Sequence, residues 1–172
     1  MWWRSLGLAA VLALAACQVR PLYQGTATSG PLSPLPDLRA IVVDPPRDRT
    51  EQVLTNELKF LFRGDGGDPA EELYRLRILA DASNDPLAVE LEEDLPAAVL
   101  VTLNATFILS EVASERTLLT GSSTTSASYD FSSQRFANVR AEKDAEERAA
   151  RAMAENISAR VAAYFAARRS DT

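Results

Sequence analysis

Two segments of the chain repeat apolar residues at helical spacing. In the first, the apolar positions are Leu54, Leu58, Leu61 and Phe62. Residues that recur three and four positions apart lie on one face of a helix. Asp48 precedes this segment as a candidate N-cap, Glu51 follows it three residues later as the second half of a capping box, and Gly64 supplies a stop. The pattern predicts a helix from just after Asp48 to Gly64.

The second helical segment closes the chain, from about residue 141 to residue 168. Its apolar positions are Ala145, Ala149, Met153, Ile157, Val161 and Phe165. Acidic residues gather at its start, and Arg168 and Arg169 stand at its end. This distribution matches the helix dipole, which favours anions at the N-terminus and cations at the C-terminus. The segment predicts a long amphipathic helix.

Between the helices the apolar period changes to two, which is typical of half-buried strands. A short apolar run at residues 38–43, ended by two prolines, predicts a first strand. Alternation then predicts strands at residues 73–80, 87–91 and 99–109. A turn at residues 114–116 leads into a last strand at 117–131, which is rich in Ser and Thr.

The order of these elements predicts an α+β fold. We expect a two-layer sandwich, in which a mixed or antiparallel sheet of about four to five strands carries two helices packed on one face. The two helices should share one core through Leu58, Phe62, Ile157, Val161 and Phe165.

The N-terminus predicts export and lipid attachment. Residues 1–16 contain Arg4, a short apolar run and small residues before Cys17, which is the order of a cleaved signal peptide. Cys17 is the only cysteine, so it has no disulfide partner, and we interpret it as the lipidation site. Residues 17–37 then form the lipidated N-terminus and a flexible tether, and residues 38–172 form a single domain. Gln18, in place of Asp, favours the outer membrane.

The composition excludes several kinds of partner and of catalytic or metal site. The formal net charge of −6 argues against a nucleic-acid partner. The chain has no histidine, which excludes a Ser-His-Asp triad and the usual zinc sites. The carboxylate run at residues 92–94 is interpreted as a solvated turn, and Lys59 and Lys143 as surface charges and not as parts of a Ser-Lys dyad. We therefore predict no enzyme activity, no metal site and no cofactor apart from the lipid on Cys17.

Two polar features remain as candidate binding surfaces. The run at residues 121–128 lacks the Gly-Lys-Ser/Thr ending of a phosphate loop. It is better explained as a strand with a hydroxyl-rich face, which is either solvated or packed in a wet cavity of a partner. Arg75 and Arg77 lie two residues apart on one strand face and could grip an anion. The alternative is that they balance nearby acids.

Four short motifs, in this order, resemble the alphaproteobacterial form of the LptE lipopolysaccharide-assembly family. They are Arg-Pro-Leu-Tyr at residues 20–23, Asp-Arg-Thr-Glu at 48–51, Tyr-x-Leu at 74–76 and Asp-Ala-Glu-x-Arg-Ala at 144–149. The resemblance spans nearly the whole mature chain.

The resemblance implies an outer-membrane lipoprotein that faces the periplasm, plugs the LptD barrel and helps to assemble it during lipopolysaccharide delivery. It implies two partners, the LptD barrel and lipopolysaccharide. Candidate barrel contacts are then Ser122, Thr124, Ser126 and Ser128, and candidate lipopolysaccharide contacts are Arg75, Arg77 and Arg116. The alternatives are an auxiliary outer-membrane lipoprotein of an ABC-type lipid-trafficking transporter and a lipid-anchored periplasmic hydrolase.

Overall fold

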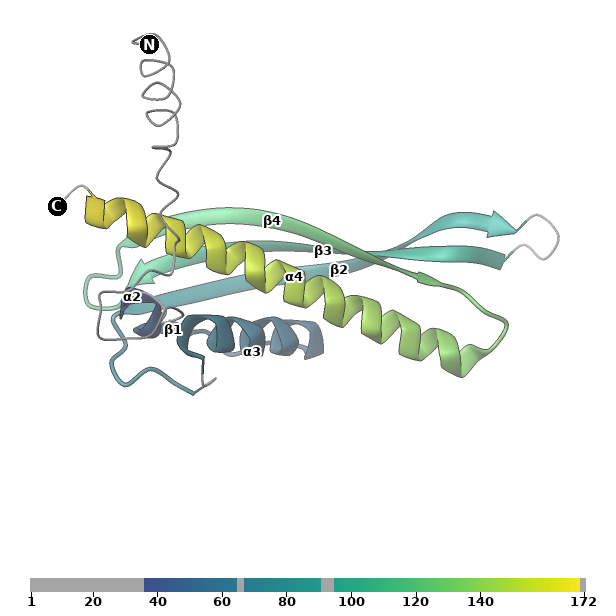
Figure 1. Ribbon diagram of the computed structural model, residues 1–172, viewed down its shortest axis with the longest axis horizontal. Helices are drawn as coiled ribbons and strands as arrows, with labels where there is room; N and C mark the ends of the chain where they lie inside the picture. The colour runs from purple at the N-terminus through teal and green to yellow at the C-terminus, as the bar shows by residue number, and fades with distance from the viewer. Residues whose placement is uncertain (1–35, 65–66, 91–94, 171–172) are drawn as a thin grey trace, which may run out of the picture. The chain divides into compact units, whose positions relative to one another are not determined.

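A computed structural model describes residues 36–64, 67–90 and 95–170 (Figure 1). The predicted signal peptide, Cys17, Gln18 and the motif at residues 20–23 lie outside the described residues. So do the acidic run at 92–94 and the predicted tether, apart from Pro36 and Asp37.

The described chain forms one open sheet of four strands with helices packed on it. The element order is α2 (Pro36–Arg39), β1 (Ile41–Val43), α3 (Arg49–Arg63), β2 (Tyr74–Glu90), β3 (Leu95–Glu111), β4 (Thr117–Asp130) and α4 (Arg135–Ser170). The strands stand in the order β1-β2-β3-β4. β1 is parallel to β2, and the other pairs are antiparallel. The predicted α+β class with a mixed sheet is confirmed, and the described part holds three helices where two were predicted.

β2 is one continuous strand where the sequence predicted two, at residues 73–80 and 87–91. Residues 81–86 include Ser83, Asn84 and Pro86, which are typical of a turn, yet they pair in register with β3 from Asp81 to Pro86. The register shifts directly after Pro86, and proline is tolerated in a sheet at such an irregularity or on an edge strand. Long-range pairing with β3 therefore overrides the local turn signal.

α2 replaces the first part of the strand predicted at residues 38–43. Pro36 occupies the first helical position, where its fixed φ and missing N–H are favourable. Leu38 is fully buried, and Asp37 accepts a hydrogen bond of 2.5 Å from Nη2 of Arg169 at the end of α4. Only Ile41–Val43 remains a strand, where it pairs with Tyr74–Leu76.

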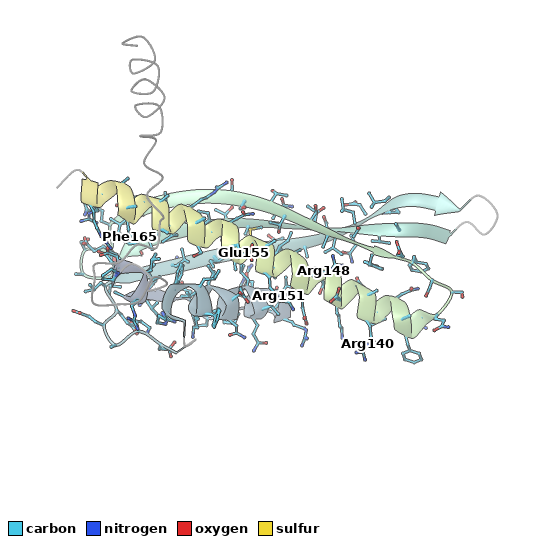
Figure 2. All side chains as sticks on the ribbon, in the orientation of Figure 1. Arg140, Arg148, Arg151, Glu155 and Phe165 are labelled. Atoms are coloured by element: carbon cyan, nitrogen blue, oxygen red, sulfur yellow. The ribbon has the colours of Figure 1, made fainter. Side chains whose placement is uncertain are left out.

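The predicted core is confirmed. Its members are Leu58, Phe62, Ile157, Val161 and Phe165, and each is at most 2% exposed. Phe165, which is labelled in Figure 2, also contacts Tyr74 of β2, and the ring centroids are 4.8 Å apart. Residues from both long helices and from the sheet thus share one core.

The ends of α3 follow the sequence signals, whereas α4 begins earlier than predicted. Gly64 has a left-handed φ of 82°, and its N–H donates to the carbonyl of Phe60. α4 starts at Arg135 and not near residue 141. The side chain of Asn138 accepts from the N–H of Ser132 and donates to its carbonyl, which ties the first turn to the preceding loop. Apolar periodicity misses this turn because the turn adds little to the core, and Phe136 is 88% exposed there.

Candidate functional site: the open face of the sheet

Burial alternates along β3 and β4, so the sheet has one covered and one open face. Val101, Leu103 and Phe107 of β3 are buried under the helices, whereas the intervening side chains are more accessible. Alternate side chains of a strand point to opposite faces. We call the accessible side the open face; it is formed by Arg75, Arg77, Leu79, Asp81 and Ser83 of β2, Thr102, Asn104, Thr106, Ile108 and Ser110 of β3, and Thr120, Ser122, Thr124, Ser126 and Ser128 of β4.

Strand register places hydroxyl and amide groups side by side on this face. Thr106 is paired with Ser122, Asn104 with Thr124, and Thr102 with Ser126. Thr124 Oγ1 donates to Asn104 Oδ1 at 2.7 Å. Between Thr102 and Thr106, the β3–β4 part of the open face is therefore a polar, uncharged surface that can exchange hydrogen bonds with water or with a polar partner.

The structure places all four predicted barrel-contact residues of β4 on the open face, where each is exposed. The residues between them face α4, and Thr125 Oγ1 donates to the carbonyl of Ala149 at 2.9 Å. Gly121 has a packing role, because a Cβ there would lie 2.6 Å from Cζ of the buried Phe107. That contact accounts for the glycine without a phosphate loop.

Arg75 and Arg77 come together at one end of the open face. They line a cavity of about 480 Å³ with Ser110, Glu111, Glu115 and other residues. Asp44 lies between them, with Oδ2 3.0 Å from Nε of Arg77 and Oδ1 4.0 Å from Nε of Arg75. An anionic ligand would have to compete with this carboxylate.

Arg116 does not join the other two candidate arginines. It lines a different cavity, of about 370 Å³, with Tyr164, Ala167 and Arg168 of α4. Its Nη2 also lies 3.7 Å from Oε2 of Glu111. The resemblance grouped these three arginines as candidate lipopolysaccharide contacts, but Arg116, in the turn after β3, lines a cavity beside α4.

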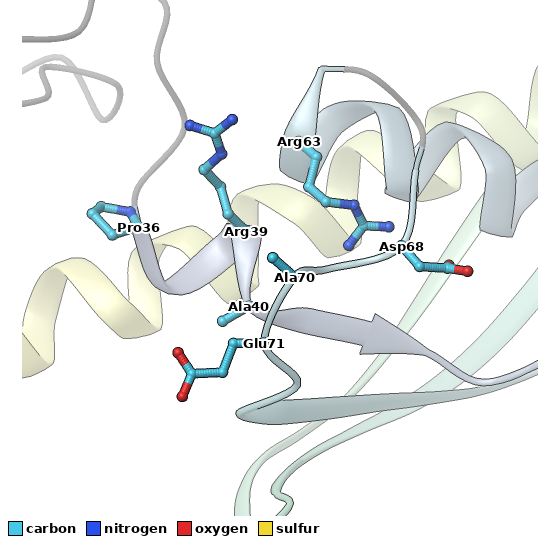
Figure 3. Close-up of a pocket in the computed structure, with 7 residues that line it drawn as sticks. All are labelled: Pro36, Arg39, Ala40, Arg63, Asp68, Ala70 and Glu71. Atoms are coloured by element: carbon cyan, nitrogen blue, oxygen red, sulfur yellow. The ribbon is translucent and has the colours of Figure 1, made fainter.

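A further cavity contains an arginine that the sequence did not single out. Arg63 at the end of α3 is only 7% exposed, and its Nη1 donates to the carbonyl of Ile41 at 2.7 Å. Figure 3 shows Arg63 near Asp68, with Arg39 also among the residues that line this cavity of about 360 Å³. The sequence carries no signal for it, because a charged residue at a helix C-terminus is ordinarily solvated.

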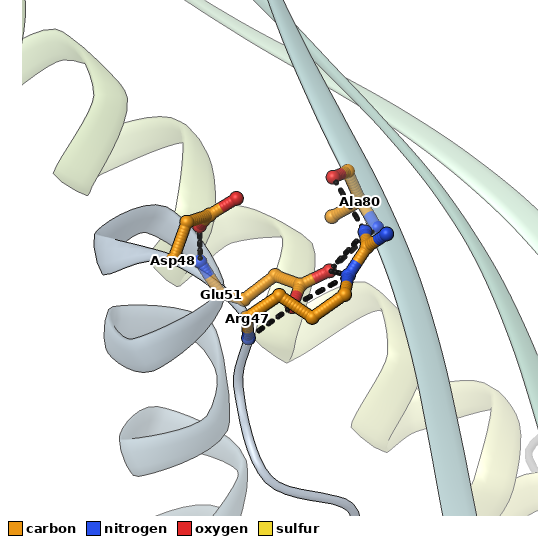
Figure 4. Close-up of polar contacts among 4 residues, drawn as sticks. All are labelled: Arg47, Asp48, Glu51 and Ala80. Carbon is orange, nitrogen blue, oxygen red and sulfur yellow. Dashed lines mark hydrogen bonds and ion pairs between the residues drawn. The ribbon is translucent and has the colours of Figure 1, made fainter.

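On the covered face of the sheet, Glu51 forms the most buried charged contact of the described residues (Figure 4). The N–H of Glu51 donates to Asp48 Oδ1 at 2.8 Å, as a capping box requires. The Glu51 carboxylate, however, accepts from the N–H of Arg47 at 2.7 Å and not from that of Asp48. It also accepts from the N–H of Ala80 at 3.1 Å, on the part of β2 that extends beyond β1.

Arg47 completes this contact. Its guanidinium lies 2.6 Å from Glu51 Oε1, and Nη2 donates to the carbonyl of Ala80 at 3.3 Å. Burial alone would raise the pKa of Glu51, but the hydrogen bonds from Arg47 and Ala80 outweigh it and hold the pKa below its ordinary value. Glu51 and Arg47 thus occupy both backbone groups of Ala80 at the edge of β2.

Within the described residues, no group of three or more His, Cys, Asp or Glu side chains is arranged to hold a metal ion. The described helices include none that is both long and apolar enough to cross a membrane.

Comparison with known proteins identifies a family. Residues 38–161 match the family model described as LptE: Lipopolysaccharide-assembly. No curated protein sequence gives a significant match.

Solved structures with a similar fold include lipoproteins from three bacteria. A protein from Caulobacter crescentus CB15 described as a lipoprotein superimposes with a TM-score of 0.63 at 18% identity, over 75% of this chain and 92% of that one. Rare lipoprotein B from Shewanella oneidensis superimposes with a TM-score of 0.56 at 10% identity, over 76% of this chain and 97% of that one. A minor lipoprotein from Acinetobacter baumannii superimposes with a TM-score of 0.51 at 18% identity, over 72% of this chain and 88% of that one. At these identities the likeness concerns the fold.

Proposed function

The chain belongs to the LptE lipopolysaccharide-assembly family, and from this membership we propose that it is an outer-membrane lipoprotein that plugs the LptD barrel. In this role it assists barrel assembly and lipopolysaccharide delivery to the outer leaflet, without catalysing a reaction. The open face is the observation that carries the proposal. A barrel lumen is wet and polar, so a plug should present hydroxyl and amide groups to it.

The lipid anchor on Cys17 is the first part of this proposal to test. Cys17→Ala should accumulate as an unprocessed precursor and should take up no labelled palmitate, because the thiol is the lipid acceptor. Gln18→Ala, which leaves the thiol in place, is the control and should be lipidated. A Cys17→Ala protein that is still cleaved and membrane-bound would contradict the anchor.

The plug role is tested on the open face itself. Ser122→Trp combined with Ser126→Trp should lower the amount of LptD barrel that copurifies from membranes at least about tenfold, which corresponds to about 1.4 kcal/mol. Ser122→Thr with Ser126→Thr keeps the hydroxyl groups and should retain the barrel. Both pairs lie at exposed positions, so urea unfolding of the isolated proteins should stay within about 0.5 kcal/mol of wild type.

Photo-crosslinkers identify the partner directly. A crosslinker at Thr124 should label inward-facing strand residues of the barrel. Recovery of an inner-membrane lipid transporter in place of the barrel would contradict the plug role and support the auxiliary-transporter function. Unchanged surface lipopolysaccharide and barrel assembly after depletion of the protein would also contradict it.

Lipopolysaccharide contact is a separate part of the proposal. Arg75 and Arg77 are the favoured contacts, because they line one cavity at the end of the open face. Arg116 would have to act from the cavity beside α4. Phosphate groups would then bind locally, as the acidic net charge of the chain does not favour general attraction of anions.

A further inference from the structure

Two arginines of α4 donate hydrogen bonds to the free edge of β4. β4 is the last strand of the sheet, so only one of its sides pairs with β3. Arg160 Nη1 donates to the carbonyl of Ser122 at 2.5 Å, and Arg148 Nη2 donates to the carbonyl of Ser128 at 2.9 Å. The two arginines are spaced by about 18 Å of helix, and the two serines by about 20 Å of strand. The spacing of the two arginines along α4 therefore matches the spacing of the two serines along β4.

Between these two contacts the edge of β4 is open. In an antiparallel strand the N–H and C=O of one residue point to the same side, and successive residues alternate. Because Ser122 and Ser128 point to the free side, Thr124 and Ser126 do so as well. No side chain in the described ranges donates to or accepts from the backbone of Thr124 or Ser126. Among the described residues, the N–H and carbonyl groups of Thr124 and Ser126 on the free side thus have no partner between the arginines.

The sequence of β4 gives this edge no protection of its own. Residues 117–128 contain neither a charged residue nor a proline, the features that normally keep edge strands from pairing with other chains. The opposite edge differs, because the part of β2 that extends beyond β1 carries Arg77 and Asp81, and the carbonyls of Ile41 and Ala80 accept from Arg63 and Arg47. β4 is therefore the edge where strand addition is most favourable.

We propose that Arg148 and Arg160, the edge arginines, keep β4 from pairing antiparallel with β4 of a second copy of this chain. The sequence of β4 is suited to pairing with β4 of a second copy of the chain. Two-fold pairing that sets Ser122 against Ser128 also sets Thr124 against Ser126. Every outward residue of this segment then faces a hydroxyl residue, with no like charges opposed. The edge arginines occupy the carbonyls at both ends of that register.

The test removes both edge arginines from the full chain, as Arg148→Ala with Arg160→Ala. Light scattering should show a dimer whose dissociation constant is at least about tenfold lower than that of wild type. Hydrogen exchange at the amides of Thr124 and Ser126 should slow by a similar factor, because these groups become paired. Arg140→Ala with Arg151→Ala makes the same charge change on α4 (Figure 2) and should leave the protein monomeric with fast exchange.

A proline separates edge pairing from other kinds of association. Thr124→Pro, added to the variant that lacks the edge arginines, should restore the monomer. The N–H of Thr124 points to the free side, so proline removes no bond to β3. If the double variant does not fold, Arg148→Ala and Arg160→Ala are each measured alone and should shift both readouts in the same direction. Monomeric variants with fast exchange at Thr124 and Ser126, or a dimer that survives Thr124→Pro, would overturn the proposal.

Discussion

Val161→Asp is expected to lower the free energy of unfolding by at least about 4 kcal/mol, which is a large part of the about 5–15 kcal/mol that stabilises an ordinary domain. Val161 is fully buried on the side of α4 that packs on the sheet. A carboxylate there has no partner and must either stay charged in an apolar site or take up a proton. The lost burial of the valine adds about 2 kcal/mol.

Two variants separate the causes of this loss. Ala163→Asp puts the same carboxylate on the exposed side of α4 and should cost less than about 1 kcal/mol. Val161→Ala removes packing without adding charge and should cost about 2 kcal/mol. Urea unfolding followed by circular dichroism measures all three. Wild-type stability for Val161→Asp would mean that α4 does not pack on the sheet through this residue.

Glu51→Gln is expected to cost about 2–3 kcal/mol at pH 7, although it changes one atom. Both Glu51 oxygens accept hydrogen bonds from donors, namely the N–H and guanidinium of Arg47 and the N–H of Ala80. The amide nitrogen of glutamine would face one of these donors and leave it unsatisfied. Glu57→Gln makes the same charge change on the same helix and should stay within about 0.5 kcal/mol of wild type.

The contribution of Glu51 depends on pH in a definite direction. Its pKa in the folded protein is lowered, so the unfolded chain takes up the proton first as the pH falls. The stabilisation is present above the unfolded value of about 4.3 and is lost as the pH falls through the lower folded value. The gap between wild type and Glu51→Gln in urea unfolding should therefore be full at pH 6–7 and narrow below about pH 4. A gap that stays constant down to pH 3 would contradict this role of the carboxylate.

Several arginines of this chain lie against the edges of the sheet and not on its open face. Arg47, Arg63, Arg148 and Arg160 each donate to a strand carbonyl at the edge of the sheet. Each of these arginines occupies one edge carbonyl, and the side chains of the open face remain the main surface for a partner. A plug that binds through its face and not through its edges would stay distinct from the strands of the barrel wall.

Local signals in the sequence were sufficient for α3, for most of α4, for the alternation of the strands and for the family. Asp48, Gly64 and the apolar face of α3 act within a few residues of one another, so they can be recognised in one dimension. The same holds for the hydroxyl residues of β4, whose period of two places Ser122, Thr124, Ser126 and Ser128 on one face whatever the neighbours are.

The tertiary structure decided what depends on distant partners. Pairing with β3 made residues 74–90 one strand in spite of their turn residues, and residues 36–39, predicted in part as a strand, form the helix α2, in which Leu38 is buried. The same packing separated Arg116 from Arg75 and Arg77 and brought α4 to the free edge of β4. Periodicity reports which face of an element is apolar. It carries no information on which element will cover that face or which edge will remain open, because strand order and register are fixed by contacts between residues far apart in the chain.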